Sequence, residues 1–529
     1  MAPVEPEARS QSNALPIALF AGPTLLVVAV SAHVLYIARR AARALPPSTT
    51  TRSQQPLRRR HAAIFSVLAF LSLASVTTFA VVWRALSYLE WAEKGNHETP
   101  GSLWTGWYGT GEEGVGRWRL GDWLSDVHLG QEADTVAVLN PQGFIYTSQH
   151  WLGLAASSMF MGIEGKRRNI SASAIISFIY LGAAGSLSYA LCLFFVTMLY
   201  TPVAQHSDDT PRHDALFAPK PVVYYAPIVA SVLSLYTWPK FLVGNGDSWL
   251  PRVGYSAVPL VLAFAPQIIP TSWGHQHVSK ASAHRSFIKP FHALSVASLL
   301  LYWNLFASSV FYNTPPEQAS VYDLVKNSIG RQDHSRSNRL LIGISDTAQK
   351  LKLISTHPAI SVTSVDVLFT AISLLAWAFT RNLDTDSILE NSFLSPLAAY
   401  KEEKHVEFEE KVEKIEEESG VLPPVTPKRR GRPKKNVNGA SAPAVPASVR
   451  RSARRKTRSD YESDAESTYE PPTSAKKEMA QTETDGTTDV EDIISGGEST
   501  ALAMFLSFAG GLGQLAASVL GSEVTGVYE

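Results

Sequence analysis

The stretch GFIYTSQHWLGLAASSMFMGIEGKRRN, residues 143–169, is about as long as one helix that crosses a bilayer. Gln149 and His150 lie in its first turns, and the carboxylate of Glu164 closes its apolar run. A charged group at the edge of a membrane helix costs free energy. The basic residues 166–168 follow Glu164 almost directly. Small residues recur along the stretch, at Gly153, Ser157 and Gly162. The stretch is therefore predicted to be one membrane-spanning helix.

The bulk composition conceals two unlike parts of the chain. The 529 residues are 45% hydrophobic and 18% charged with a net charge of zero, yet long apolar runs dominate residues 1–395 and are almost absent from 400–495. The net charge is therefore an average that indicates no partner. Cys192 is the single cysteine, which excludes intrachain disulfides and a cysteine-rich metal site. No phosphate loop, nucleophile elbow or zinc-binding helix motif is present, so the familiar soluble enzyme classes have no support.

Apolar segments predict further spans on both sides of the opening stretch. The first, residues 14–38, reads as an uncleaved anchor and not as a signal peptide, because Glu5 and Glu7 precede it and two arginines follow it. The others are expected at residues 62–83, 171–199, 221–242, 251–270, 287–312 and 360–380. Together with residues 143–169 they predict an all-α, polytopic transmembrane bundle of about eight spans, within a range of seven to nine.

The arginines of residues 39–60 place that loop in the cytosol by the positive-inside rule and the N-terminus in the lumen. Residues 86–142 then form a lumenal, tryptophan-rich loop, either an interfacial loop with two short helices or a lid over a pocket. The basic loop 313–358 is expected in the cytosol. Asn169 begins a glycosylation pattern that this topology puts on the cytosolic side, so we expect it to be unmodified.

Eight spans from a lumenal start place the C-terminus in the lumen, which conflicts with the charged segment that follows. Residues 401–419 are a helix-prone run of Glu and Lys, and residues 420–495 have the composition of a disordered tail. Either one middle span is false, with the pair around residues 244–247 the weakest, or the tail is lumenal. A last apolar segment, residues 500–520, is predicted as a further span or an interfacial hairpin.

The tail carries a basic motif that resembles the AT-hook, an extended peptide that binds the narrow minor groove of A·T-rich DNA. Its candidate contacts are Arg430, Arg432, Lys434 and Lys435. The alternatives are a solvated basic tail or one that contacts acidic lipid headgroups. The histidines at 275, 277, 284 and 292 cluster between two spans without a carboxylate or cysteine beside them, so we expect no metal site there.

Two intramembrane carboxylates are the candidates for chemistry. Asp366 lies within the span 360–380, and Glu164 ends the span 143–169. A carboxylic acid kept neutral by an apolar pocket can protonate an alkene or epoxide, and aromatic faces stabilise the resulting carbocation. The side chains expected to line such a pocket are Gln149, His150, Tyr302, Trp303 and Trp377. The alternative is that each carboxylate pairs with a basic or amide neighbour to fix helix packing, as Arg167 and Arg168 could do for Glu164.

Four short patterns resemble a known group of proteins. They are QHWLGL at 149–154, GIEGKRRNI at 162–170, DVL at 366–368 and WAFTR at 377–381. They resemble the fungal membrane-bound terpene cyclases of meroterpenoid pathways, of the ascochlorin and ascofuranone type, and their uncharacterised multi-span relatives. The resemblance covers roughly residues 60–395 and implies a multi-span fold that cyclises a prenylated substrate. It carries no catalytic residue across to this chain.

The expected organisation is an anchor with a basic loop (1–61), a multi-span membrane domain (62–395), a charged tail (396–497) and an apolar C-terminal segment (498–529). The expected function is a cyclase of the endoplasmic reticulum or nuclear envelope, which acts on an apolar prenylated molecule in the bilayer. Asp366 or Glu164 would donate the proton, and no metal or redox cofactor is expected, because proton-initiated cyclisation moves no net electrons. The alternatives are a non-enzymatic membrane protein whose tail contacts DNA or acidic lipid, and a transporter.

Overall fold

A computed structural model of the chain describes residues 12–44, 49–97, 99, 118–201, 217–245, 249–268, 270–277, 280–315, 336–398 and 488–526. These residues belong to one unit, which comprises Met1–Ala398 and Thr488–Glu529. The second unit, Ala399–Thr487, lies outside the described residues together with its basic motif. The disorder of the tail and its contacts with DNA or lipid therefore stay predictions.

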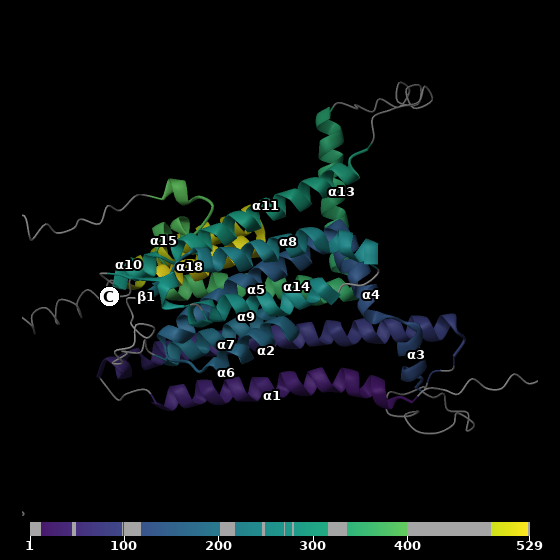
Figure 1. Cartoon of the computed structure of the whole chain (residues 1–529), viewed down its shortest axis with the longest axis horizontal. Coiled ribbons are helices and arrows are strands. Elements are labelled where there is room, and N and C mark those ends of the chain that lie inside the picture. The colour runs from purple at the N-terminus through teal and green to yellow at the C-terminus, as the bar shows by residue number, and fades with distance from the viewer. Residues whose placement is uncertain are drawn as a thin grey trace, which may run out of the picture. The chain divides into compact units, whose positions relative to one another are not determined.

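The unit is built almost entirely of helices (Figure 1). The long ones are α1 (Ala14–Ala44), α2 (Thr49–Lys94), α5 (Pro141–Arg167), α8 (Val222–Asn245), α9 (Trp249–Ile268), α11 (Ile288–Asn313), α13 (Arg336–Ser355), α14 (Pro358–Arg381) and α18 (Thr488–Thr525). The short ones are α3 (Leu120–Asp126), α4 (Leu129–Asp134), η1 (Thr135–Leu139), α6 (Ala172–Ala184), α7 (Leu187–Tyr200), η2 (Thr271–Trp273), α10 (Lys280–Arg285), α15 (Thr385–Glu390) and η3 (Ser395–Leu397). Two short strands, β1 (Phe217–Pro219) and β2 (Gly274–Gln276), pair antiparallel.

Six of the described helices are long and apolar enough to cross a membrane: α1, α2, α8, α11 with the end of α10, α14 and α18. Large apolar side chains on these helices point outward, as Leu25 and Val28 of α1 do. An outward-facing apolar surface of this kind fits a hydrocarbon solvent. The expectation of a mostly helical fold with several membrane-spanning candidates is confirmed.

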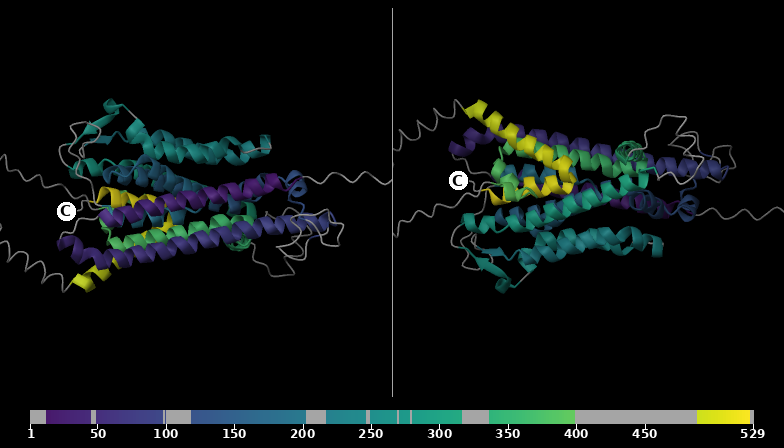
Figure 2. Two further views of the ribbon diagram at one scale, coloured as in Figure 1. Left: turned by 90° about the horizontal axis from the view of Figure 1, so that it is seen from below. Right: turned by 90° about the horizontal axis from the view of Figure 1, so that it is seen from above.

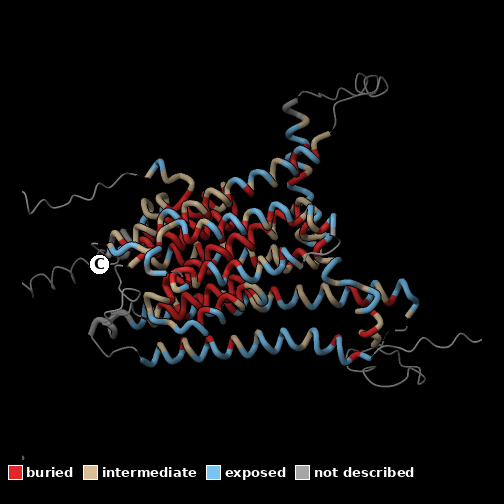
Figure 3. The backbone as a smooth tube through the Cα atoms, viewed as in Figure 1, coloured by how far each residue is buried: buried red, intermediate tan, exposed pale blue. Residues whose placement is uncertain are grey.

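Helix α5, which contains most of the opening stretch, lies at the centre of the core. Nearly every residue from Gln142 to Gly165 is buried. Its small residues are packing positions: a Cβ at Gly162 would clash with the backbone of Ala263 in α9, and one at Gly153 would press on Leu512 of α18. Figure 3 shows the buried residues gathered in this central part, while α1 is exposed along most of its length.

The span predicted over residues 171–199 is wrong, because the chain turns back in its middle. Helix α6 ends at Ala184, and α7 begins after Gly185 and Ser186. The two helices run antiparallel, with the rings of Phe178 and Phe194 5.1 Å apart across the hairpin. Both flanks are strongly apolar, so hydropathy alone does not reveal the break. We call this element the α6–α7 hairpin.

The end of α7 lies beside the residues that precede α6. Arg168, four residues before α6, donates from Nη1 to the carbonyl oxygens of Met198 and Thr201 at the end of α7, at 3.3 and 2.5 Å. The hairpin therefore enters and leaves at one end of the bundle, the end where α5 and α14 finish with Arg167 and Arg381. We call this the basic end.

Helix α18 also doubles back and makes a second hairpin. Gly511 has φ 77° and ψ −168°, a backbone conformation that breaks the helix and favours glycine. After the break, Gly513 lies against Gln149 in the first half of α5, while Val524 accepts a hydrogen bond from Arg167 at the basic end. Figure 2 shows both arms of α18, in yellow, running toward that end. The apolar C-terminal segment is thus a hairpin, but one that is buried in the bundle.

Helices α3, α4 and α13 lie at the opposite end of the bundle (Figure 1). The described part of residues 86–142 contains the short helices α3, α4 and η1, and Trp123 of α3 is buried. Lys350 of α13 donates to the Asn313 side chain at the end of α11, at 2.6 Å. The described parts of residues 86–142 and 313–358 therefore lie at the same end of the bundle, whereas their predicted placement on opposite sides of a membrane requires opposite ends. The break in the span predicted at 171–199 accounts for the difference, because a hairpin there returns the chain to the end from which it started.

Candidate functional site

Asp366, in the first half of α14, is buried and accepts hydrogen bonds on both carboxylate oxygens. Oδ1 accepts from the Ser186 hydroxyl at 2.6 Å and from the Ser188 N–H at 3.2 Å. Oδ2 accepts from the Leu187 N–H at 2.8 Å and lies 2.9 Å from Nε2 of His150. Since a backbone N–H can only donate, each oxygen of Asp366 acts as an acceptor.

These contacts follow from the break between α6 and α7. A helix that begins inside an apolar bundle leaves its first N–H groups without partners, and its dipole favours a negative charge there. Ser186 caps α7 locally by accepting from the Tyr189 N–H, and its hydroxyl lies 2.6 Å from that of Ser72. Asp366 supplies from another helix the acceptors that the Leu187 and Ser188 N–H groups need.

His150 of α5 continues the hydrogen-bonded chain from Asp366 to Tyr255 of α9. Its Nδ1 lies 2.8 Å from the Tyr255 hydroxyl. Because Oδ2 of Asp366 accepts, Nε2 of His150 is assigned as the donor to it. In neutral His150 the Nδ1 atom then accepts from the Tyr255 hydroxyl. In the imidazolium form Nδ1 donates instead, and the Tyr255 proton is available to another acceptor. The three residues form what we call the Asp–His–Tyr chain.

An aromatic cluster lies beside Tyr255, between α5, α8 and α9. The ring of Trp151 is 5.1 Å from that of Tyr255 and 5.6 Å from that of Trp238, edge to face in both pairs. The indole N–H groups of both tryptophans are buried without a hydrogen-bond partner among the described residues. A buried donor without a partner costs free energy, so these groups could receive a polar atom of a bound molecule.

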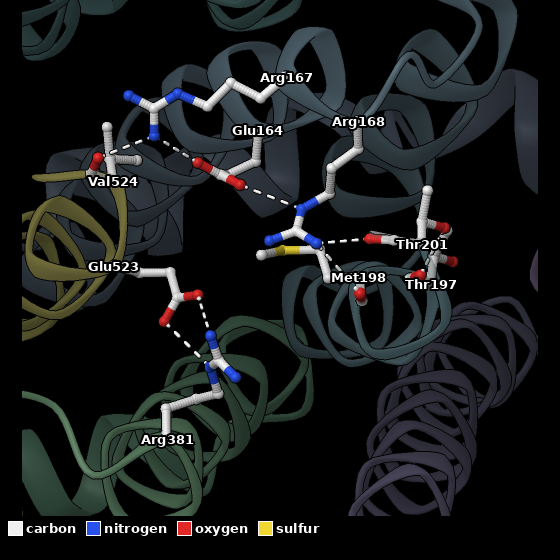
Figure 4. A network of polar contacts seen from close by, with 9 residues as sticks. All are labelled: Glu164, Arg167, Arg168, Thr197, Met198, Thr201, Arg381, Glu523 and Val524. Carbon is white, nitrogen blue, oxygen red and sulfur yellow. Dashed lines mark hydrogen bonds and ion pairs between the residues drawn. The ribbon is translucent and has the colours of Figure 1, made fainter. Parts of the chain in front are cut away.

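Glu164 lies far from the Asp–His–Tyr chain, at the basic end. It follows His150 by fourteen residues on α5, which is roughly 21 Å at 1.5 Å per residue. Its oxygens accept from Arg167 at 2.7 Å and from Arg168 at 3.1 Å (Figure 4). The arginine partners expected for Glu164 are confirmed. Figure 4 also shows a second ion pair, in which the half-buried Arg381 lies 3.1 Å from the buried Glu523.

The other side chains expected to line one pocket are spread through the bundle. Gln149 accepts from the Gly513 N–H at the turn of α18. Trp377 stacks on Phe195 with ring centroids 4.0 Å apart, toward the basic end. Trp303, half exposed on α11, donates to the carbonyl of Ala509 at 2.8 Å, and Tyr302 is its neighbour. Of the seven predicted residues, only Asp366 and His150 contact each other through hydrogen bonds that the structure describes.

The histidines between α9 and α11 do not gather around a metal site. His277 lies 2.9 Å from the Ser282 hydroxyl, and His292 lies 2.8 Å from the Ser392 carbonyl oxygen. Partial burial, and then the nearby His275, lower the pKa of His277. Within the described residues no group of three or more His, Cys, Asp or Glu side chains could hold a metal ion.

Comparisons with known protein families, curated proteins and solved structures each found no match for this chain. The site therefore has to be interpreted from its own geometry.

Sequence reasoning missed three residues that complete the site: Ser186, Tyr255 and Trp151. The pair Gly185–Ser186, small and polar between two apolar runs, is a signal for the break in the helix. Tyr255 gives no such signal, because its position beside His150 depends on how α9 packs against α5.

Proposed function

We propose that the chain is a multi-pass membrane protein with seven crossings and two hairpins that enter from one side. The crossings are α1, α2, α5, α8, α9, α11 and α14, and the hairpins are α6–α7 and α18. The basic end gathers the arginines that precede α2 and follow α5, which the positive-inside rule assigns to the cytosol. Seven crossings from a lumenal N-terminus then put the charged tail in the cytosol. This resolves the conflict that eight spans create.

We propose further that the Asp–His–Tyr chain is an acid–base centre for a membrane-embedded cyclase. The observation that carries the proposal is a chain of three titratable side chains, linked at 2.9 and 2.8 Å, inside an otherwise apolar bundle. Ionisable groups at such depth are costly and are typical of functional sites. The endoplasmic reticulum or nuclear envelope would be the membrane, and the substrate an apolar prenylated molecule.

The roles differ from a mechanism in which Asp366 donates the proton. Because both of its oxygens accept hydrogen bonds, Asp366 holds His150 in place by accepting from its Nε2–H. The proton is then delivered through the hydroxyl of Tyr255, which is the last residue of the chain. The ring of Trp151 packs against that of Tyr255, and Trp238 packs against Trp151, so aromatic rings that could stabilise a developing cation lie close to this site.

The proposed reaction balances without a redox partner. A proton opens an epoxide or adds to an alkene of the linear substrate, and carbon–carbon double bonds attack in turn to close rings. The last carbocation loses a proton, which returns to the Asp–His–Tyr chain. The product is an isomer of the substrate.

Expression of the full chain in a host that is fed a linear epoxy-prenyl precursor tests this function. We expect a cyclised isomer with the unchanged chain and precursor alone with the His150→Gln variant. Recovery of precursor alone from well-folded unchanged protein would exclude this reaction for the tested precursor.

Two other functions have an observation in their favour. Two hairpins whose turns meet α5 inside the bundle are also typical of transporters, in which broken helices line the substrate path. A cytosolic tail, in turn, would let Arg430, Arg432, Lys434 and Lys435 reach DNA or acidic lipid. Imaging of a tagged chain without residues 428–435 separates the last function from catalysis, because a cyclase should keep both its location and its activity.

A further inference from the structure

A pocket of about 310 Å³ opens at the basic end, between the ends of α2, α5, α7, α14 and α18. Both basic and apolar side chains line the pocket. Arg58, His61 and Arg381 are among the basic ones, and Leu57, Leu199 and Trp377 are among the apolar ones. A pocket with such a lining suits a molecule that has both an anionic group and a hydrocarbon part.

The charges around the pocket favour an anion. Arg381 pairs with Glu523, whose side chain is 1% exposed, and its guanidinium lies over the ring of Trp377 at 5.5 Å. Arg168 is held by Glu164 and by two carbonyl oxygens (Figure 4). The two carboxylates that line or support the pocket are thus both in ion pairs with arginine.

Around the pocket the described residues include four arginines, Arg58, Arg167, Arg168 and Arg381, and two carboxylates, Glu164 and Glu523. Arg167 shares Glu164 with Arg168, and its Nη2 atom is buried without a hydrogen-bond partner among the described residues. Arg58 and His61 are both half buried and line the pocket from α2. A basic pocket between helix ends at the cytosolic face of a membrane is a typical site for a lipid phosphate.

We propose that this pocket binds the phosphate group of a membrane lipid, with Arg58, His61 and Arg381 around the phosphate and the acyl or prenyl chain along Leu57 and Leu199. The site does not depend on the proposed cyclase activity. Arg381 follows Asp366 by fifteen residues on α14, which is roughly 22 Å along the helix.

Lipid binding to the purified full-length protein tests the proposal. The protein is placed in phosphatidylcholine nanodiscs, and native mass spectrometry counts the phosphatidic acid that is retained. Diacylglycerol, which has the same chains without the phosphate, is the first comparison. Inorganic phosphate, added as a competitor, distinguishes a lipid source from a free anion.

The variants are Arg58→Gln and His61→Gln, with Arg59→Gln as the matched control. Arg59 is an exposed arginine next to Arg58 on the same helix, and it does not line the pocket. Arg58→Gln should weaken the binding of phosphatidic acid by about fivefold, the effect of one charge near the membrane surface. His61→Gln should weaken it by a smaller factor, because it removes a hydrogen-bonding ring and not a fixed charge. Arg59→Gln should change it by less than about twofold, because salt screens an exposed charge.

A third variant tests the cavity itself. Thr380→Trp fills the pocket from α14 while every charge stays in place, so it should also reduce the binding of phosphatidic acid. Competition by inorganic phosphate with the same residue dependence would support the phosphate site and identify a soluble ligand as its source. Equal binding of diacylglycerol, an equal effect of Arg59→Gln, or unchanged binding by Thr380→Trp would each overturn the proposal.

Discussion

The Ser186 hydroxyl lies 2.6 Å from Oδ1 of Asp366, which joins the turn of the α6–α7 hairpin to the middle of α14. The carboxylate accepts from two backbone N–H groups of the same turn and contacts His150 as well. One side chain therefore has two functions. It satisfies a helix end inside the bundle, and it anchors the Asp–His–Tyr chain.

Asp366→Asn should lower the stability of the protein substantially. The amide has one acceptor oxygen, so its NH₂ group must face either the Leu187 N–H or the Ser188 N–H. A buried N–H that is left without an acceptor costs about 1–3 kcal/mol. Thermal unfolding in detergent measures the loss, with Asp346→Asn on α13 as the control. Equal stability of the two variants would contradict the capping role of Asp366.

Tyr255→Phe should separate catalysis from packing. The substitution keeps the ring against Trp151 and removes only the hydroxyl that contacts His150. We expect a loss of stability of about 1 kcal/mol and a fall in turnover of about 100-fold or more, as for the loss of a general acid. Product formation measured against Tyr236→Phe, an exposed tyrosine of α8, checks this prediction. Full activity of Tyr255→Phe would exclude proton delivery through Tyr255.

Gly511→Ala should destabilise the α18 hairpin. Gly511 has φ 77°, and a Cβ there would press on the side chain of Gln149. The combined strain is of order 1–3 kcal/mol. Gly497→Ala is the matched control on the same helix, because nothing lies within 4 Å of its Cβ position. There the exchange should stabilise the helix by up to about 1 kcal/mol. The order of the two melting temperatures checks the prediction, and the reverse order would contradict the turn at Gly511.

Glycosylation mapping should place the tail and α13 on opposite sides of the membrane. An acceptor sequence inserted after Ser355 should receive a glycan, whereas one inserted within residues 399–487 should not, and native Asn169 should stay unmodified. A mobility shift that an endoglycosidase removes is the measurement. A glycan in the tail or at Asn169 would contradict seven crossings with a cytosolic basic end.

The sequence predicted the helical class of the fold better than its breaks. The mostly helical architecture, the apolar candidate spans and the arginine partners of Glu164 agree with the structure. These features are local or follow from hydropathy and charge. Hydropathy averages over about a helix length, so it does not detect turns such as Gly185–Ser186 inside apolar runs.

The contacts of the site depend on tertiary packing, which a single sequence does not encode in any local pattern. His150 and Asp366 were both singled out by their polarity in apolar surroundings, but their contact spans 216 positions in the chain. Trp377, Tyr302 and Trp303 were chosen as aromatic residues near the spans, yet they pack elsewhere. Aromatic residues are common in membrane helices, so residue type alone could not distinguish them from Trp151 and Trp238.

The most direct test of the acid–base centre is the cyclisation of a linear epoxy-prenyl precursor by purified protein in nanodiscs. Unchanged protein, His150→Gln and Tyr236→Phe are compared at equal folded concentration. The Asp–His–Tyr chain predicts a cyclised isomer from the unchanged protein and from Tyr236→Phe, and precursor alone from His150→Gln. Equal cyclisation by His150→Gln would contradict the central claim.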